Sequence, residues 1–113
     1  MNAIAAVGYW SGWYWREQRD SIALLYRAVQ AKRQGDMIGN RRWREAARAA
    51  EARLVALVEA LRAFCRARDI DPGQALAASG VDRFKPAFDV APDLTYQATI
   101  ENTLAELAGR RAA

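Results

Sequence analysis

The stretch that decides the fold is residues 40–69, which read NRRWREAARAAEARLVALVEALRAFCRARD. Within it, apolar positions alternate spacings of four and three residues without interruption: Trp43, Ala47, Ala50, Leu54, Leu57, Leu61 and Phe64. This heptad spacing places all of these side chains along one side of an α-helix, where they form an apolar seam. The pattern predicts a helix over residues 41–68, about 42 Å long at 1.5 Å per residue. We expect the seam to lie in an intramolecular helical core; the alternative is a helix shared with neighbouring chains in a homo-oligomer or larger assembly.

A row of arginines lies on the same predicted helix, beside the seam: Arg41, Arg44, Arg48, Arg62 and Arg66. At 100° per residue, these positions fall within about 60° of one another. Such a row is typical of a surface that binds nucleic-acid phosphates without base preference. It is also typical of a solvated helix face, because Glu45, Glu51 and Glu59 offer ion-pair partners at helical spacing. The sequence leaves both interpretations open.

A second amphipathic stretch precedes the first and predicts a helix over residues 13–34. Large apolar side chains share one face of it, which we expect to be buried: Trp15, Ile22, Leu25, Tyr26 and Val29. Residues 35–39 then interrupt the helical pattern, with Gly35 expected to end the first helix and Asn40 to cap the next. A connection this short predicts an antiparallel helical hairpin.

The remainder of the chain predicts two shorter helices. Asp71 followed by Pro72 is a typical helix start, and the helix that it begins is expected to end near Gly80. Residues 81–92 contain two prolines and read as a connector, and residues 93–108 predict a last helix. The predicted fold is therefore all-α: a helical bundle built on a long antiparallel two-helix hairpin, with a short third helix and a C-terminal fourth helix.

Length and charge indicate one domain with three parts. A chain of 113 residues is long enough for a single core, so residues 1–113 are expected to form one all-helical domain. Its parts are an apolar, aromatic N-terminal segment (1–12), a basic helical hairpin (13–69) and acidic C-terminal helices (70–113). Residues 16–68 hold thirteen Lys or Arg against six Asp or Glu, whereas residues 69–113 hold four against seven. This polarity suggests an anionic partner, or self-association between the two halves of neighbouring chains.

The N-terminal segment and the start of the hairpin concentrate aromatic side chains: Tyr9, Trp10, Trp13 and Trp15. One interpretation is that they pack against the bundle. The other is that they anchor a protein partner, since aromatic side chains are enriched where interfaces gain most of their binding energy. The apolar run is too short to span a membrane and lacks a basic n-region, so membrane insertion is not expected. The single Cys65 fits a reducing compartment, and we expect a cytoplasmic protein.

The composition argues against the common kinds of catalytic site. The chain contains no histidine, which removes the commonest general base and metal ligand. No glycine-rich phosphate loop, nucleophile elbow or cysteine cluster is present in the sequence. We therefore expect no catalytic residues, no metal, no cofactor and no small-molecule substrate, and hence a protein that is not an enzyme.

These observations lead to two expectations of function. The first is a small non-enzymatic helical subunit or accessory protein of a nucleoprotein assembly, which binds DNA or RNA backbone non-specifically through the arginine row. The alternative is a protein-interaction module that binds no nucleic acid and uses the aromatic cluster, such as a phage-type inhibitor, adaptor or assembly chaperone. In size and basic helical character the chain resembles the small subunits of CRISPR surveillance complexes and phage packaging accessory proteins, a likeness that no motif carries.

Overall fold

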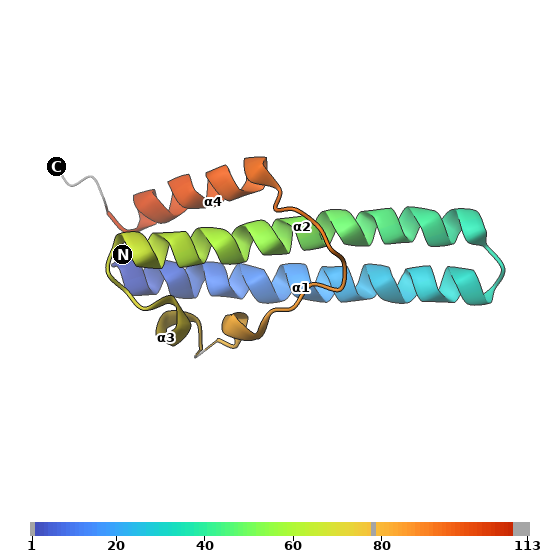
Figure 1. Ribbon diagram of the computed structural model, residues 1–113, viewed down its shortest axis with the longest axis horizontal. Coiled ribbons are helices and arrows are strands. Elements are labelled where there is room, and N and C mark those ends of the chain that lie inside the picture. Colours follow the sequence, from blue (N-terminus) through green and yellow to red (C-terminus); the bar gives the residue numbers. More distant parts are fainter. Residues whose placement is uncertain (1, 78, 110–113) are drawn as a thin grey trace.

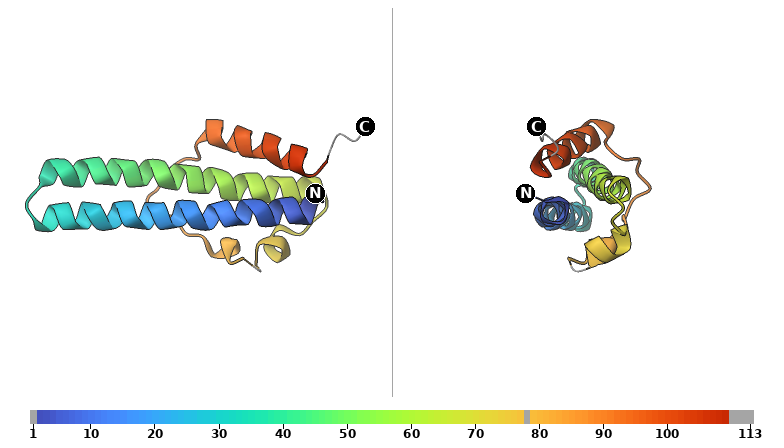
Figure 2. Two further views of the ribbon diagram at one scale, coloured as in Figure 1. Left: turned by 180° about the vertical axis from the view of Figure 1, so that it is seen from behind. Right: turned by 90° about the vertical axis from the view of Figure 1, so that its left-hand side faces the viewer.

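The computed structural model describes residues 2–77 and 79–109, so residues 1, 78 and 110–113 of the expected domain lie outside it. Within the described residues the chain is helical and contains no strand. The helices are α1 (Ala3–Arg33), α2 (Met37–Ala67), α3 (Pro72–Ala77), the short 3₁₀ helix η1 (Val81–Arg83) and α4 (Leu94–Leu107). The all-α prediction is confirmed: α1 and α2 form a long antiparallel hairpin, and α3 and α4 lie on opposite sides of it (Figures 1 and 2).

The hairpin turn follows the prediction at α1 but not at α2. Gly35 adopts a left-handed conformation (φ 77°), and the N–H of Asp36 donates to the carbonyl of Ala31 at 2.8 Å, which ends α1. The carboxylate of Asp36 then accepts the N–H of Gly39 at 2.8 Å, so α2 begins at Met37. Capping by Asn40 was therefore a wrong prediction, because Asp36 is the cap and Asn40 lies inside the helix, with its own N–H bonded to the carbonyl of Asp36.

The first helix begins ten residues earlier than residues 13–34 predict. Asn2 caps it by accepting the N–H of Ala5 at 2.8 Å, and α1 runs without a break through the aromatic segment. Gly8 and Gly12 each cost about 1 kcal/mol relative to alanine in a helix. Burial of Trp10 and Tyr14 outweighs that cost, since each large apolar side chain contributes about 1.5–3 kcal/mol when it leaves water.

The face of α1 that was expected to be buried is largely exposed. Four of its five side chains are exposed, and the prediction for them was wrong: Trp15 (49%), Ile22 (59%), Tyr26 (61%) and Val29 (47%). The buried side of this half of α1 instead carries small residues: Ser21, Ala28 and Ala31. They face a stretch of α2 whose buried residues are Ala47 and Ala50, so the two helices pack closely and the larger side chains remain outside.

The apolar seam of α2 forms the core, as predicted, with Trp43 half-buried and the other six positions buried. Leu54, Leu57 and Leu61 belong to a cluster that also contains Ile100 and Leu104 of α4. Leu76 and Val81 close the cluster on the other side. The core thus fills the half of the hairpin that α3 and α4 flank, where α1 begins and α2 ends (Figure 1).

Beyond this core, the hairpin continues as two helices alone. We call residues 22–50 the free half of the hairpin; it contains the end of α1, the turn and the start of α2 (Figures 1 and 2). Its helices are joined by Asn40, whose buried side-chain amide donates to the carbonyl of Ala28 at 2.8 Å. The molecule is accordingly elongated, 58 Å in its longest dimension and 25 Å in the next.

Candidate nucleic-acid interface

Positive charge gathers on the free half. Residues 22–50 hold seven Lys or Arg against two acidic residues, whereas residues 51–109 hold six against nine. One of the two acidic residues, Asp36, is occupied as the cap of α2. The end of the molecule that no other described helix covers is therefore the end with the strongest positive potential.

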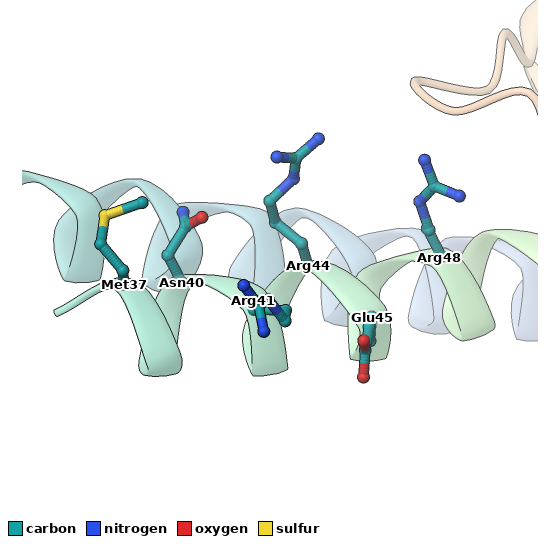
Figure 3. A pocket seen from close by; sticks show the side chains of 6 residues that line it. All are labelled: Met37, Asn40, Arg41, Arg44, Glu45 and Arg48. Carbon is teal, nitrogen blue, oxygen red and sulfur yellow. The ribbon is translucent and has the colours of Figure 1, made fainter.

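Three of the five predicted arginines lie together on this free half. Arg41, Arg44 and Arg48 are exposed on α2 and line a shallow depression of about 430 Å³ with Met37, Asn40 and Glu45. Figure 3 shows the side chains of Arg44 and Arg48 projecting in the same direction from α2, whereas Arg41 and Glu45 lie on another side.

These arginines have no acidic partner within the described part of the chain. Across residues 2–77 and 79–109, the structure contains a single ion pair, between Arg53 and Glu17 at 3.3 Å. The neighbouring Glu45, a candidate ion-pair partner in the sequence, forms none with any of these residues. The guanidinium groups of Arg44 and Arg48 are thus left for an external anion or for solvent.

The other two arginines, Arg62 and Arg66, form a separate group. They line a depression of about 340 Å³ with Glu59 of α2 and Gln97 of α4. Along α2, Arg48 and Arg62 are about 21 Å apart at 1.5 Å per residue. The structure therefore does not bring the five arginines into one continuous surface.

The connector between η1 and α4 separates the predicted arginines of α2 into two groups. The carboxylate of Glu51 accepts the N–H groups of Ala87 and Phe88, and the carbonyl of Ala52 accepts the N–H of Asp93 at 3.0 Å. At 100° per residue, Glu51 and Ala52 fall on the same side of α2 as the arginines. The connector consequently crosses that side between Arg48 and Arg62.

Two cations that the sequence argument left out belong to the same surface. Lys32 and Arg33, in the last turn of α1, join Arg44 around a groove of about 610 Å³ between α1 and α2. These two cations could have been predicted from the sequence, because an antiparallel hairpin places the end of the first helix beside the start of the second. The groove also contacts Phe88, over whose ring Arg48 lies at 5.2 Å.

The aromatic cluster does not form one exposed surface. Trp10 is in the core, and Trp13 is half-buried with Arg16 stacked 4.5 Å from its ring. Trp15 donates its indole N–H to the carbonyl of Ser79 at 2.9 Å and so fastens the segment after α3. Tyr9 is exposed, with its ring edge-to-face against Trp10 at 5.7 Å. Packing within the bundle thus accounts for Trp10 and Trp13, whereas Tyr9 and Trp15 are 48% and 49% exposed.

The Trp15 ring lies so close to residue 80 that glycine is favoured at this position. Gly80 has a positive φ of 77°, and a Cβ atom there would lie 3.2 Å from the Trp15 ring. Both the backbone conformation and the space thus favour the absence of a side chain. This contact gives Trp15 a structural role at the place where α1 meets the segment that leads to η1.

Cys65 is fully buried, and desolvation raises the pKa of its thiol, with the Arg66 guanidinium opposing and the Asp71 carboxylate adding to the shift. Among residues 2–77 and 79–109, no group of three or more acidic, cysteine or histidine side chains is placed to hold a metal ion. None of the helices in this part of the chain is long and apolar enough to cross a membrane.

Comparison with known proteins identifies no family for this chain. The chain matches no protein-family model and no curated protein, and no solved structure matches it. The case for a function therefore depends on the free half of the hairpin and its charge.

Proposed function

We propose that this protein is a small, non-enzymatic helical subunit or accessory protein of a nucleoprotein assembly, which binds the nucleic-acid backbone through the free half of its hairpin. The contacting residues in this proposal are Arg41, Arg44 and Arg48, with Lys32 and Arg33 from the facing helix. The observation that carries it is a set of cations that have no acidic partner among the described residues, on the end of the molecule that none of the described helices covers. A cytoplasmic location belongs to the same proposal.

The chemistry of these side chains suits phosphate. Guanidinium groups donate paired hydrogen bonds to phosphate oxygens, and an exposed basic surface gains affinity by releasing counterions from the nucleic acid. Arg62 and Arg66 lie about 21 Å and 27 Å from Arg48 along α2, beyond the connector, and are expected to contribute little to the same contact.

Binding of this kind carries no base preference from the phosphate contacts. Asn40, the amide side chain that lines the depression with Arg41 and Arg44, already donates its amide N–H to the carbonyl of Ala28. The Asn40 side chain is also only 7% exposed, so little of its amide can reach a base edge. Apart from the arginines, the other polar side chain in this depression is Glu45, which repels phosphate.

The test compares two matched pairs of substitutions on the same helix. Arg44→Gln with Arg48→Gln removes two cations from the free half, whereas Arg62→Gln with Arg66→Gln removes two from the separate group. Binding of labelled single- and double-stranded oligonucleotides is measured by fluorescence anisotropy over a salt series. We expect the first pair to lower the slope of log affinity against log salt concentration by about 0.7 to 0.9 for each arginine–phosphate contact that it removes. The second pair should leave this slope nearly unchanged.

Two results would overturn this proposal. The first is the absence of binding by either kind of oligonucleotide at about 50 mM salt, where electrostatic contacts are weakly screened. The second is an equal loss of affinity in the two double variants, which would assign binding to net charge rather than to the free half.

A second candidate function rests on a different observation, the apolar side chains exposed on the free half. Ile22, Tyr26 and Val29 lie at positions i, i+4 and i+7 on one face of α1, and Ile38 near the turn is 75% exposed. Such a stripe beside a basic surface suits an amphipathic, acidic protein partner. A protein-interaction module of this kind would use the free half rather than the aromatic cluster, and it becomes the leading candidate if no oligonucleotide binds.

A further inference from the structure

We infer that the strand bound by the free half is single-stranded, and that one unpaired base enters the groove between α1 and α2 while its phosphates contact the cations around it. The inference rests on the proposed function and adds to it a class of nucleic acid. The groove measures about 610 Å³ and has apolar walls from Leu25 and Val29 of α1 and from Phe88 of the connector. This volume is within the range of sites that enclose small ligands.

The aromatic wall of the groove is held in place before any ligand binds. The N–H of Phe88 donates to Glu51 at 2.8 Å, and the guanidinium of Arg48 lies 5.2 Å from the centre of its ring. Glu51 is 4% exposed, so this hydrogen bond is shielded from water. A ring fixed in this way loses little freedom when a flat base packs against it.

The groove combines cations with apolar walls, so we expect its ligand to carry both a negative charge and an apolar group. Lys32, Arg33 and Arg44 line the groove, and none of the described residues that line it is acidic. A second copy of the free half is a poor occupant because it carries the same excess of positive charge. An α-helix of a partner protein, about 10–12 Å across with its side chains, is large for this space.

A nucleotide unit combines the two required properties, and only an unpaired one makes both available. In a duplex the base faces are stacked and the edges are paired, so phosphates alone would reach the protein. In a single strand the base can pack against Phe88 and Val29 while the neighbouring phosphates contact Arg44. Arg44 lines both the groove and the depression, and Arg48 projects in the same direction, so a strand leaving the groove continues from Arg44 to Arg48.

The test uses a charge-matched pair of substitutions on α1. Val29→Glu places a carboxylate in the groove, whereas Ile22→Glu adds the same charge two turns away at a similarly exposed position outside it. Both substitutions weaken long-range attraction alike, so their difference reports the groove. Affinities for a single-stranded oligonucleotide and for its duplex are measured by anisotropy, and a 2-aminopurine label in the single strand reports stacking of a base.

We expect the single strand to bind more tightly than the duplex, and Val29→Glu to weaken it about fivefold or more beyond Ile22→Glu, the size of one base–aromatic stack. For the duplex the two variants should differ by less than they do for the single strand, because the duplex places no base in the groove. Phe88→Leu, which keeps an apolar side chain, should remove the change in 2-aminopurine fluorescence. Circular dichroism verifies that each variant keeps its helices.

Other outcomes separate the inference from the function on which it rests. Equal binding of single strand and duplex, with no difference between the two α1 variants, would overturn the inference and leave phosphate binding in place. The inference would also be overturned if the single strand bound more tightly than the duplex but Val29→Glu and Ile22→Glu weakened its binding equally. The base would then bind outside the groove. No binding by either oligonucleotide at about 50 mM salt would overturn the proposed function and the inference together.

Discussion

The carboxylate of Glu51 accepts the backbone N–H of Phe88 at 2.8 Å through one oxygen, while its other oxygen accepts that of Ala87 at 2.9 Å. These bonds join α2 to a connector more than 35 residues away in sequence. They close one end of the groove, and they place the connector across the face of α2 that carries the arginines. A single buried carboxylate thus determines both the wall of the groove and the division of the row.

Glu51→Gln should therefore destabilise the protein. The substitution keeps the size of the side chain but replaces one acceptor oxygen with an N–H donor, which leaves one of the two partly buried N–H groups without an acceptor. A loss of about 1–3 kcal/mol in the free energy of unfolding is expected from urea denaturation. Glu59→Gln, at an exposed position on the same helix, is the matched control and should change stability by less than about 0.5 kcal/mol. Equal stabilities of the two variants would contradict the role assigned to Glu51.

The sequence predicts most of the helical framework because local signals specify it. The apolar seam of α2, Gly35 at the turn and Asp71 before Pro72 of α3 each act through neighbouring residues, and the structure places them as predicted. The buried face of α1 is different. From Ser21 onward it consists of serine and alanine, which contribute little to an apolar pattern, whereas Ile22 and Tyr26 dominate the pattern and are exposed.

The candidate site was less predictable for a related reason. Nothing in the local sequence distinguishes Glu51 from the solvated Glu59, because its partners are backbone N–H groups of a distant connector. Periodicity places Arg62 and Arg48 on the same side of α2. They do not form one surface, because the connector crosses that side between them. Periodicity gives the direction of a side chain from its helix, and the rest of the chain determines what covers it.

Leu61→Ala should cost far more than a comparable substitution in the free half. Leu61 is fully buried among residues of α2 and α4, and removing its side-chain atoms leaves a cavity. Losses of about 2–5 kcal/mol are typical for such sites. Ile22→Ala, at a position that is 59% exposed, should cost less than about 0.5 kcal/mol apart from small effects of helix propensity. Chemical denaturation of both variants gives the comparison, and similar losses would show that the two halves of the hairpin do not differ in packing.

Adjacent aromatic residues near the start of α1 should respond differently to truncation. Trp10→Ala removes a core side chain and is expected to lower the free energy of unfolding by about 3–5 kcal/mol. Tyr9→Ala removes a side chain that is 48% exposed and should have a much smaller effect. Thermal or urea unfolding measures both. If Trp10→Ala left stability unchanged but abolished binding to a protein partner, the aromatic cluster would be an anchor rather than part of the core.

Alkaline pH should destabilise the folded protein through groups that burial keeps protonated. Burial raises the pKa of the Cys65 thiol above its ordinary value of 9.0 and the pKa values of the Tyr14 and Tyr96 hydroxyls above 10.0. Below pH 9 these groups are neutral in both states, so their contribution to stability is fully present. Above it, the unfolded chain releases protons that the folded chain retains, and the free energy of unfolding falls as the pH rises.

The thiol and the hydroxyls can be separated by one substitution. In Cys65→Ala, the part of the decline that begins near pH 9 should disappear, while the part that begins near pH 10 remains because the tyrosines are unchanged. Urea denaturation between about pH 7 and about pH 10.5 gives the two profiles. Native protein should also react slowly with a thiol reagent at about pH 8 and rapidly in urea, because Cys65 is fully buried. Rapid reaction of the native protein, or identical pH profiles for the parent and Cys65→Ala, would contradict the buried, protonated thiol.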